Sequence, residues 1–189
     1  RAYIFLIMAC LFWSFNPVAN KFALVEIAVP QLVFMRTFLS AIIMLTVTFC
    51  MGYSFRLKQI GWRPFLLGVL DPGLTSLLFV TSLTLVSVSN TVLVMALMPF
   101  SQPILARLVL KEEVQSSIWF GAVLVLFGLS LFFLGEPFIN KDSLLGNVLL
   151  LTVFGLFTFS QLITRKIMLT EISTFVVTSS QMVSATVIM

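Results

Sequence analysis

Seven long apolar segments, separated by short polar connections, constrain the fold of this chain more than any other feature. A helix that crosses a bilayer needs about 20 mostly apolar residues, whereas the strands of a membrane barrel alternate apolar and polar residues. The continuous runs therefore predict an all-α, polytopic helix bundle in a membrane. A soluble fold of 189 residues could not bury the 60% that are hydrophobic. We expect spanning helices over residues 2–24, 31–52, 65–86, 90–109, 117–134, 144–163 and from 173 to the end.

The chain also matches itself at an offset of 145 residues without a gap. At that offset Leu11-Phe12 aligns with Leu156-Phe157, Asn16 with Gln161, Lys21 with Lys166, Glu26-Ile27 with Glu171-Ile172, and Ile43-Met44 with Ile188-Met189. One repeat holds five helices, and because five is odd, the second copy must cross the membrane in the opposite sense. We expect a first repeat over residues 1–138 and the start of an inverted second repeat over 139–189, with seven helices present and ten in the intact protein.

The basic residues predict how the bundle sits in its membrane. The side of the N-terminus carries Arg1, Arg56, Lys58, Arg63, Arg107, Lys111, Arg165 and Lys166, whereas the other side carries Lys21, Arg36 and Lys141. Cytoplasmic loops are enriched in Lys and Arg, so we expect a cytoplasmic N-terminus in a multi-pass protein of the cell (plasma or inner) membrane. The basic loops would contact anionic lipid headgroups, and this explains the formal charge of +4 without a nucleic-acid partner.

Three stretches in order resemble a known family. They are FWSFNPVANKFAL at residues 12–24, FMRTFLSA with its Arg36, and SVSNTVLVMALMPFSQPILARLVLKEEV at residues 87–114. Together they resemble the EamA-like branch of the drug/metabolite transporter superfamily. The resemblance implies a ten-helix inverted-repeat carrier that exports or exchanges small metabolites through a central cavity. The chain departs from the family pattern at Thr81 and Leu85, where aromatic residues are frequent, and Gln181 stands where the repeat predicts a partner of Arg36.

Polar residues inside the apolar segments are the first functional candidates, because a charge at the bilayer centre costs about 2.5 kcal/mol or more and normally faces a cavity or a partner. Asp71 is either a structural carboxyl group near the interface or a proton carrier or gate at a broken helix. Arg36 either attracts an anionic group of a substrate or forms a structural ion pair, with Glu26 as the nearest candidate. Lys21 either lines a cavity or extends to the interface.

Helical spacing and the repeat add further candidates. Trp13, Asn16 and Asn20 share one helix face, where they either line a cavity or bond between helices. Prolines near mid-membrane free helix hydrogen bonds and suggest hinges, and Gly121 and Gly128 predict a close-packed helix face. The candidates for a substrate cavity are Trp13, Asn16, Asn20, Lys21, Arg36, Asp71, Asn90, Met98, Gln102 and Gln161, and the candidate hinges are Pro17, Pro72, Pro99 and Pro103.

The preferred functional hypothesis is a secondary transporter of small organic metabolites such as amino acids, which works by alternating access around a midplane cavity. Mixed charge from Lys21, Arg36 and Asp71 would suit a zwitterion. A seven-helix receptor or sensor is the alternative. An intramembrane enzyme is weaker, because the chain has no His and no facing nucleophile and base. We expect a small-molecule substrate and the lipid bilayer as partners and no catalytic residue, metal, cofactor or nucleic acid. The sequence leaves the oligomeric state open.

Overall fold

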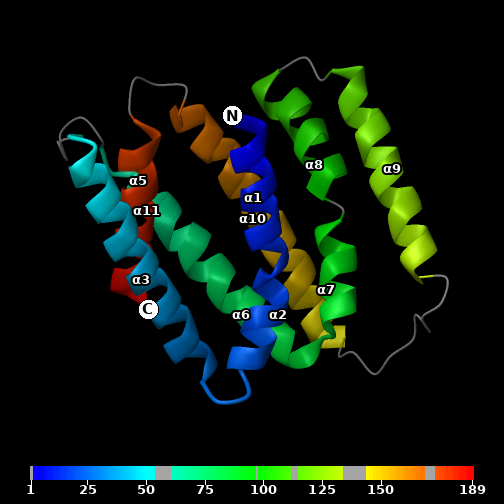
Figure 1. Cartoon of the computed structure of the whole chain (residues 1–189), viewed down its shortest axis with the longest axis horizontal. Helices are drawn as coiled ribbons and strands as arrows, with labels where there is room; N and C mark the ends of the chain where they lie inside the picture. The colour runs from blue at the N-terminus through cyan, green and yellow to red at the C-terminus, as the bar shows by residue number, and fades with distance from the viewer. Residues whose placement is uncertain (1, 54–60, 97, 112–114, 134–143, 169–172) are drawn as a thin grey trace.

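The computed structural model describes residues 2–53, 61–96, 98–111, 115–133, 144–168 and 173–189. The regular elements in these ranges are all helices (Figure 1). The predicted connections at 54–60, 112–114, 134–143 and 169–172 lie outside the described residues. The basic residues Arg56, Lys58 and Lys141 and the predicted repeat boundary at 138–139 therefore lie outside them as well.

The first two predicted spans are present. The first consists of α1 (Ala2–Ser14) and α2 (Asn16–Ala23), which together form one apolar helical stretch with a local interruption at Phe15. The second is α3 (Val29–Cys50), which has Pro30 in its first turn. Proline is tolerated there because the first turn of a helix has no carbonyl partner for that N–H.

The third and fourth spans are broken, as their prolines suggested. The third consists of α5 (Arg63–Gly68), a π-helical segment η1 (Val69–Leu74) and α6 (Thr75–Leu85). Within η1 the backbone of Asp71 is extended, with φ −142° and ψ 115°, and the Asp71–Pro72 peptide bond is cis. The fourth span consists of α7 (Val88–Met95), α8 (Met98–Leu105) and the π-helical η2 (Ala106–Leu110).

The last three spans are α9 (Ser116–Phe133), α10 (Leu144–Met168) and α11 (Thr174–Ile188). The predicted end of the sixth helix at residue 163 is wrong, since α10 continues to Met168. Thr164 and Ile167 are buried in this extra turn, while Arg165 and Lys166 are exposed. Packing therefore extends the helix, and two cations in its last turn complement the partial negative charge at a helix C-terminus.

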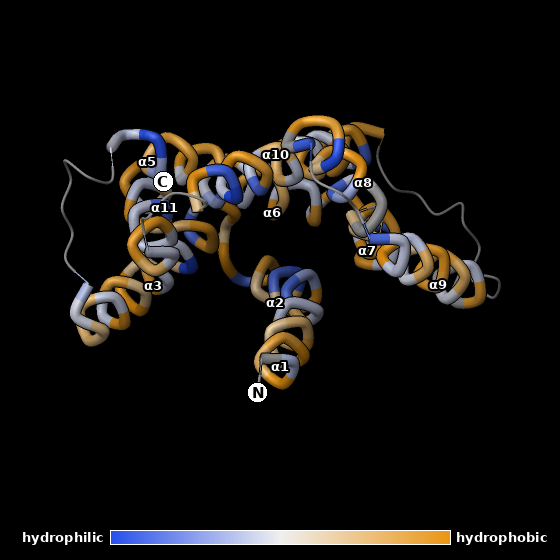
Figure 2. Tube along the Cα trace, turned by 90° about the horizontal axis from the view of Figure 1, so that it is seen from above, coloured by the Kyte–Doolittle hydropathy of each residue, from blue (hydrophilic) through white to orange (hydrophobic). Residues whose placement is uncertain are grey.

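By length and composition, the described residues contain four candidate membrane spans, Tyr3–Ala23, Val29–Cys50, Arg63–Leu85 and Leu144–Met168, besides shorter apolar helices at Ser116–Gly128 and Thr174–Ile188. Large apolar side chains are exposed along α1 and α9. Figure 2 shows these two helices as mainly hydrophobic tubes. Such surfaces are stable against lipid but not against water. The chain is therefore a multi-pass membrane protein.

The elements run alternately up and down the bundle (Figure 1). Helix α1 starts beside the N-terminus and runs downward, whereas α10 runs upward; likewise α3 runs upward and α11 downward. The helices that the sequence repeat equates therefore cross in opposite senses. Seen from above, the other helices form an arc from α3 to α9, and α1 and α2 lie on its concave side (Figure 2).

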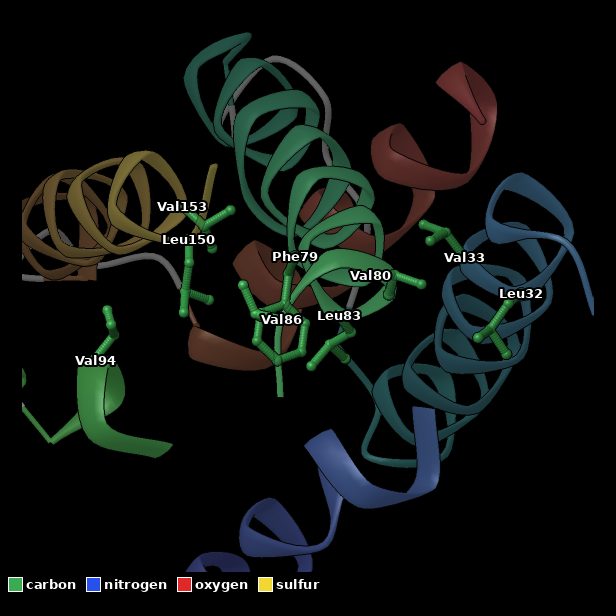
Figure 3. Packing of buried hydrophobic residues seen from close by; sticks show 9 residues of the cluster. All are labelled: Leu32, Val33, Phe79, Val80, Leu83, Val86, Val94, Leu150 and Val153. Atoms are coloured by element: carbon green, nitrogen blue, oxygen red, sulfur yellow. The ribbon is translucent and has the colours of Figure 1, made fainter. Parts of the chain in front are cut away.

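The hydrophobic core joins the second, third, fourth and sixth spans. Figure 3 shows Phe79, Val80 and Leu83 of α6 between the side chains of α3 and those of α10. The buried cluster consists of Leu32, Val33, Phe79, Val80, Leu83, Val86, Val94, Leu150 and Val153. This core makes α6 the central element and fixes the positions of α3 and α10 on either side of it.

Glycines allow two close helix contacts, but not those that the sequence suggested. A Cβ atom at Gly68 would lie 2.2 Å from the backbone oxygen of Gln181 on α11, and one at Gly146 would lie 2.7 Å from the Leu85 side chain. At Gly121 and Gly128 it would meet nothing among the described residues within 4 Å. The described part of the chain therefore does not provide the helix contact that the sequence predicted for this face of α9, and that contact stays a prediction.

Candidate functional site

A cavity of about 430 Å³ lies between helices that are far apart in the sequence. Its lining comes from α1, α2, α3, the broken third span, α7, α8, α10 and α11, and it contains one cation, one carboxyl group and several amides and hydroxyls. The lining residues are Trp13, Asn16, Val33, Arg36, Thr37, Ser40, Asp71, Pro72, Thr75, Ser76, Phe79, Met95, Met98, Val153, Phe157, Gln161, Thr164, Met168, Thr178, Gln181 and Met182. The volume suits a small organic molecule.

Arg36 enters this cavity from the N-terminal half of α3. Its Nη1 donates a hydrogen bond to Oδ1 of Asn20 over 2.8 Å. Asn20 is only 4% exposed, and its Nδ2 donates to the backbone oxygen of Asn16 over 2.7 Å. The chain of bonds ties α3 to α2 and fixes the guanidinium group. A guanidinium carries five N–H donors, and the bond to Asn20 uses one, so Arg36 can also bind an anionic ligand. Its bonded partner is Asn20 rather than Glu26, the ion-pair candidate, which is exposed.

Asp71 reaches the same cavity from the break in the third span. Thr75 donates its hydroxyl to Oδ1 of Asp71 over 2.7 Å, and Ser160 and Gln161 of α10 lie beside the carboxyl group. The Ser160 hydroxyl is fully buried and meets hydrogen-bond geometry with no group in the described part of the chain. Asp71 therefore lies at the contact between the broken span and α10, surrounded by neutral hydrogen-bonding groups.

An aromatic contact helps to close one wall of the cavity. Trp13 of α1 and Phe157 of α10 lie with ring centroids 6.1 Å apart and planes tilted by 44°. Both rings line the cavity, although Trp13 is 54% exposed overall. Tilted aromatic pairs at this distance attract one another. This contact joins the first span to its counterpart in the sequence repeat.

Six of the ten cavity candidates line this space: Trp13, Asn16, Arg36, Asp71, Met98 and Gln161. The other four, Asn20, Lys21, Asn90 and Gln102, are not among its lining residues. Asn20 nevertheless supports the site directly, because it holds Arg36. Asn90 bonds to Asn147, which joins α7 to α10.

Lys21 makes contacts that explain its place in an apolar span without a ligand. Its Nζ donates to the backbone oxygens of Leu83 over 2.5 Å and Val86 over 2.8 Å. These carbonyls lie at the C-terminal end of α6 and would otherwise lack helical partners. A cation also stabilises the partial negative charge at this end of the helix. In this structure, Lys21 docks the first span onto the third.

The four candidate hinges lie at or near helix interruptions. Pro17, Pro72 and Pro99 cannot donate to the carbonyls four residues earlier, which belong to Trp13, Gly68 and Met95. Helices α1, α5 and α7 end at or one residue after those positions. Pro103 lies inside α8 and is followed by the π-helical η2. The side chain of Pro99 lies outside the described residues.

Several lining groups escaped the sequence reasoning, mainly the hydroxyls of Thr37, Ser40, Thr75 and Ser76. Ser and Thr inside helices usually bond to their own backbone, as Thr37 does to the Val33 oxygen over 2.9 Å, so their sequence positions carry no distinctive signal. Gln181 did have one, because it is the residue that the repeat aligns with Arg36.

A family model described as the EamA-like transporter family matches residues 1–134. No curated protein and no solved structure matches the chain.

Proposed function

The chain belongs to the EamA-like transporter family, and from this premise we propose that it is a secondary transporter of small organic solutes with an anionic group, such as amino acids. Membership of the family makes it a membrane transporter of the drug/metabolite type with a small-molecule substrate. The substrate class and the mechanism are the proposal. The family consists of transporters, so the comparison favours this hypothesis over the receptor and the intramembrane enzyme.

One observation carries the proposal: Arg36 and Asp71, from different spans, line the same 430 Å³ cavity. A guanidinium group binds carboxylates by charge-assisted hydrogen bonds, and the carboxylate of Asp71 can accept from an ammonium group. The apolar and aromatic part of the lining, which includes Val33, Phe79 and Phe157, would contact a side chain. This chemistry suits a zwitterion better than a molecule with one charge.

The broken spans support transport by alternating access. Discontinuous helices around a site near the bilayer midplane are characteristic of transporters built from inverted repeats. Here the third span breaks at Asp71, on the cavity itself, and α1 and α10 cross in opposite senses (Figure 1). We therefore propose two inverted halves, residues 1–138 and the region beginning at 139. A substrate would shift their equilibrium only by its difference in affinity for the two states.

The proposed placement in the cell follows from the basic residues. The cytoplasmic side would hold the N-terminus with Arg63, Arg107 and Lys111, in the plasma or inner membrane. These residues would contact anionic headgroups there. Export or exchange would then carry solutes from the cytoplasm to the opposite side.

The proposal is tested by efflux from proteoliposomes that hold the protein and a mixed pool of amino acids and small organic acids. Mass spectrometry records which solutes leave, relative to protein-free liposomes. Asp71→Asn runs beside the wild type, with Thr46→Val as the matched control, because Thr46 is exposed on α3 and bonds to its own helix.

We expect selective efflux of one solute class from the wild type and Thr46→Val and a loss of about tenfold in Asp71→Asn, since bonds to a charged group are worth about 1.5–3 kcal/mol. A pH dependence present in the wild type and absent in Asp71→Asn would make this carboxyl group the coupling site. Folded protein that releases no member of the pool faster than protein-free liposomes would contradict the proposal.

A further inference from the structure

Residues 145 positions apart line the cavity together in four cases. The pairs are Asn16 with Gln161, Val33 with Thr178, Arg36 with Gln181, and Thr37 with Met182. In each pair, one residue comes from α2 or α3 and the other from α10 or α11, which run in opposite senses (Figure 1). Equivalent faces of the two repeats therefore meet at one cavity.

The pair at Arg36 and Gln181 is also equivalent in its hydrogen bonding. Arg36 on α3 donates to Asn20 on α2 over 2.8 Å. Gln181 on α11 donates from Nε2 to Oγ1 of Thr164 on α10 over 3.0 Å. Thr164 is the repeat counterpart of Ala19, the neighbour of Asn20. In each repeat, the polar side chain of the second span is thus held by the first span at nearly the same place.

The two equivalent side chains differ in charge. Arg36 presents a cation with N–H donors. Gln181 is neutral and 7% exposed; with Nε2 turned to Thr164, its amide oxygen Oε1 is the group that can accept a hydrogen bond from a ligand. Because the two positions are equivalent in the repeats, this difference in charge makes the cavity lining asymmetric. The asymmetry lies where a substrate can contact both side chains.

We propose that Gln181 is a specificity-determining residue of the transport cavity: Arg36 holds the anionic group of a solute, and the amide oxygen of Gln181 accepts a hydrogen bond from the ammonium group that Asp71 also attracts. This inference rests on the proposed transport function and deepens it. It assigns the orientation of the solute to two repeat-equivalent residues that line the cavity from α3 and α11. A zwitterion with one carboxylate and one ammonium group bonds to both residues, whereas a simple carboxylate or amine bonds to one.

The test uses the full protein in proteoliposomes with the amino-acid pool and two competitors that differ only in their charged group, 4-methylpentanoate and isoamylamine. The variants are Arg36→Gln, the exchange Arg36→Gln with Gln181→Arg, and Gln181→Glu alone. Gln115→Glu makes the same chemical change on an exposed residue between η2 and α9 and is the matched control. Thermal unfolding in detergent checks that each variant folds.

We expect Arg36→Gln to lower amino-acid efflux about tenfold, as loss of a charge-assisted contact implies, and the exchange variant to recover a large part of it. Gln181→Glu makes isoamylamine a better competitor by about tenfold and 4-methylpentanoate a worse one, since an added anion attracts a cation and repels a carboxylate at close range. Gln115→Glu keeps the wild-type profile.

The competition profile of Gln181→Glu is the decisive result for the role of Gln181. Glutamate has nearly the size of glutamine, so this result does not depend on how an arginine fits at position 181. Unchanged competition by both probes in a folded Gln181→Glu protein that still transports would overturn the assignment and leave the transport function standing. Absence of efflux from the wild type would instead contradict the transport function itself.

Discussion

At the scale of single residues, hydrogen bonds distinguish the roles of two cations that were equal candidates for the cavity in the sequence. Lys21 and Arg36 both lie in apolar segments, and both were candidates for the cavity. Lys21 donates to Leu83 and Val86 at the end of α6, whereas Arg36 lines the cavity and bonds to the amide of Asn20. One cation joins two spans, and the other is placed where a solute can reach it.

We predict that Lys21→Met destabilises the fold without changing solute selectivity. Methionine keeps the apolar stem but removes the donors, which leaves two carbonyls at the end of α6 unsatisfied, at a cost of about 1–3 kcal/mol. The midpoint of thermal unfolding should fall, while the relative efflux of different amino acids stays as in the wild type. An altered solute profile at an unchanged midpoint would show instead that Lys21 contacts the solute.

At the scale of elements, proline and glycine decide where helices break and how closely they approach. Pro72 frees the Gly68 carbonyl, and α5 ends at that residue. Gly68 also lets α11 approach the break, since a Cβ atom there would lie 2.1 Å from Oγ of Ser184 and 2.2 Å from the backbone oxygen of Gln181. Buried Ser179, Ser180 and Ser184 on α11 show the small side chains typical of closely packed membrane helices.

We predict opposite effects for alanine at two glycines. Gly68→Ala forces α5 and α11 apart, and overpacking of this kind costs about 1–3 kcal/mol. Gly128→Ala on α9 meets open space and should be neutral or stabilising by up to about 1 kcal/mol, because alanine has the higher helix propensity. Thermal unfolding of both variants beside the wild type gives the comparison. Equal midpoints for the two would contradict the packing described for α5 and α11.

At the scale of the whole molecule, repeat-equivalent helices cross in opposite senses and meet at one cavity (Figure 1). The cavity walls are therefore related by the repeat, while the groups they carry differ. The proposed function requires the two ends of the helix bundle to face different sides of the membrane.

We predict that these ends can be distinguished by labelling single cysteines. In a background of Cys10→Ala and Cys50→Ala, an impermeant maleimide should react with Glu26→Cys in intact cells and with Gln115→Cys only after permeabilisation. Both positions are exposed. Glu26 lies between α2 and α3, and Gln115 directly precedes α9; the α2–α3 connection and the start of α9 lie at opposite ends of the bundle (Figure 1). The expectation follows from the excess of Lys and Arg beside the N-terminus. The reverse pattern of labelling would place the N-terminus outside.

The helical spans, the positions of their breaks and the match of residues 145 apart could all be predicted from the sequence, because a bilayer demands long apolar helices and proline interrupts helix bonding locally. Those properties depend on residues that are neighbours in the sequence and on the 145-residue spacing of the repeat. Sequence reasoning also placed Asn16, Arg36, Asp71 and Gln161 among the candidates, since polar groups in apolar segments are costly without a partner.

Which partner each polar group has depends on how the helices pack against one another. Helix packing places Lys21 at the end of α6, leaves Gly121 and Gly128 without a close neighbour among the described residues, packs Gly68 against α11, and brings Gln181 to the cavity that Arg36 lines. A polar side chain looks the same in a sequence whether it bonds to a distant carbonyl or faces a cavity. The difference arises from contacts between segments far apart in the chain, and these exist only once the helices are packed.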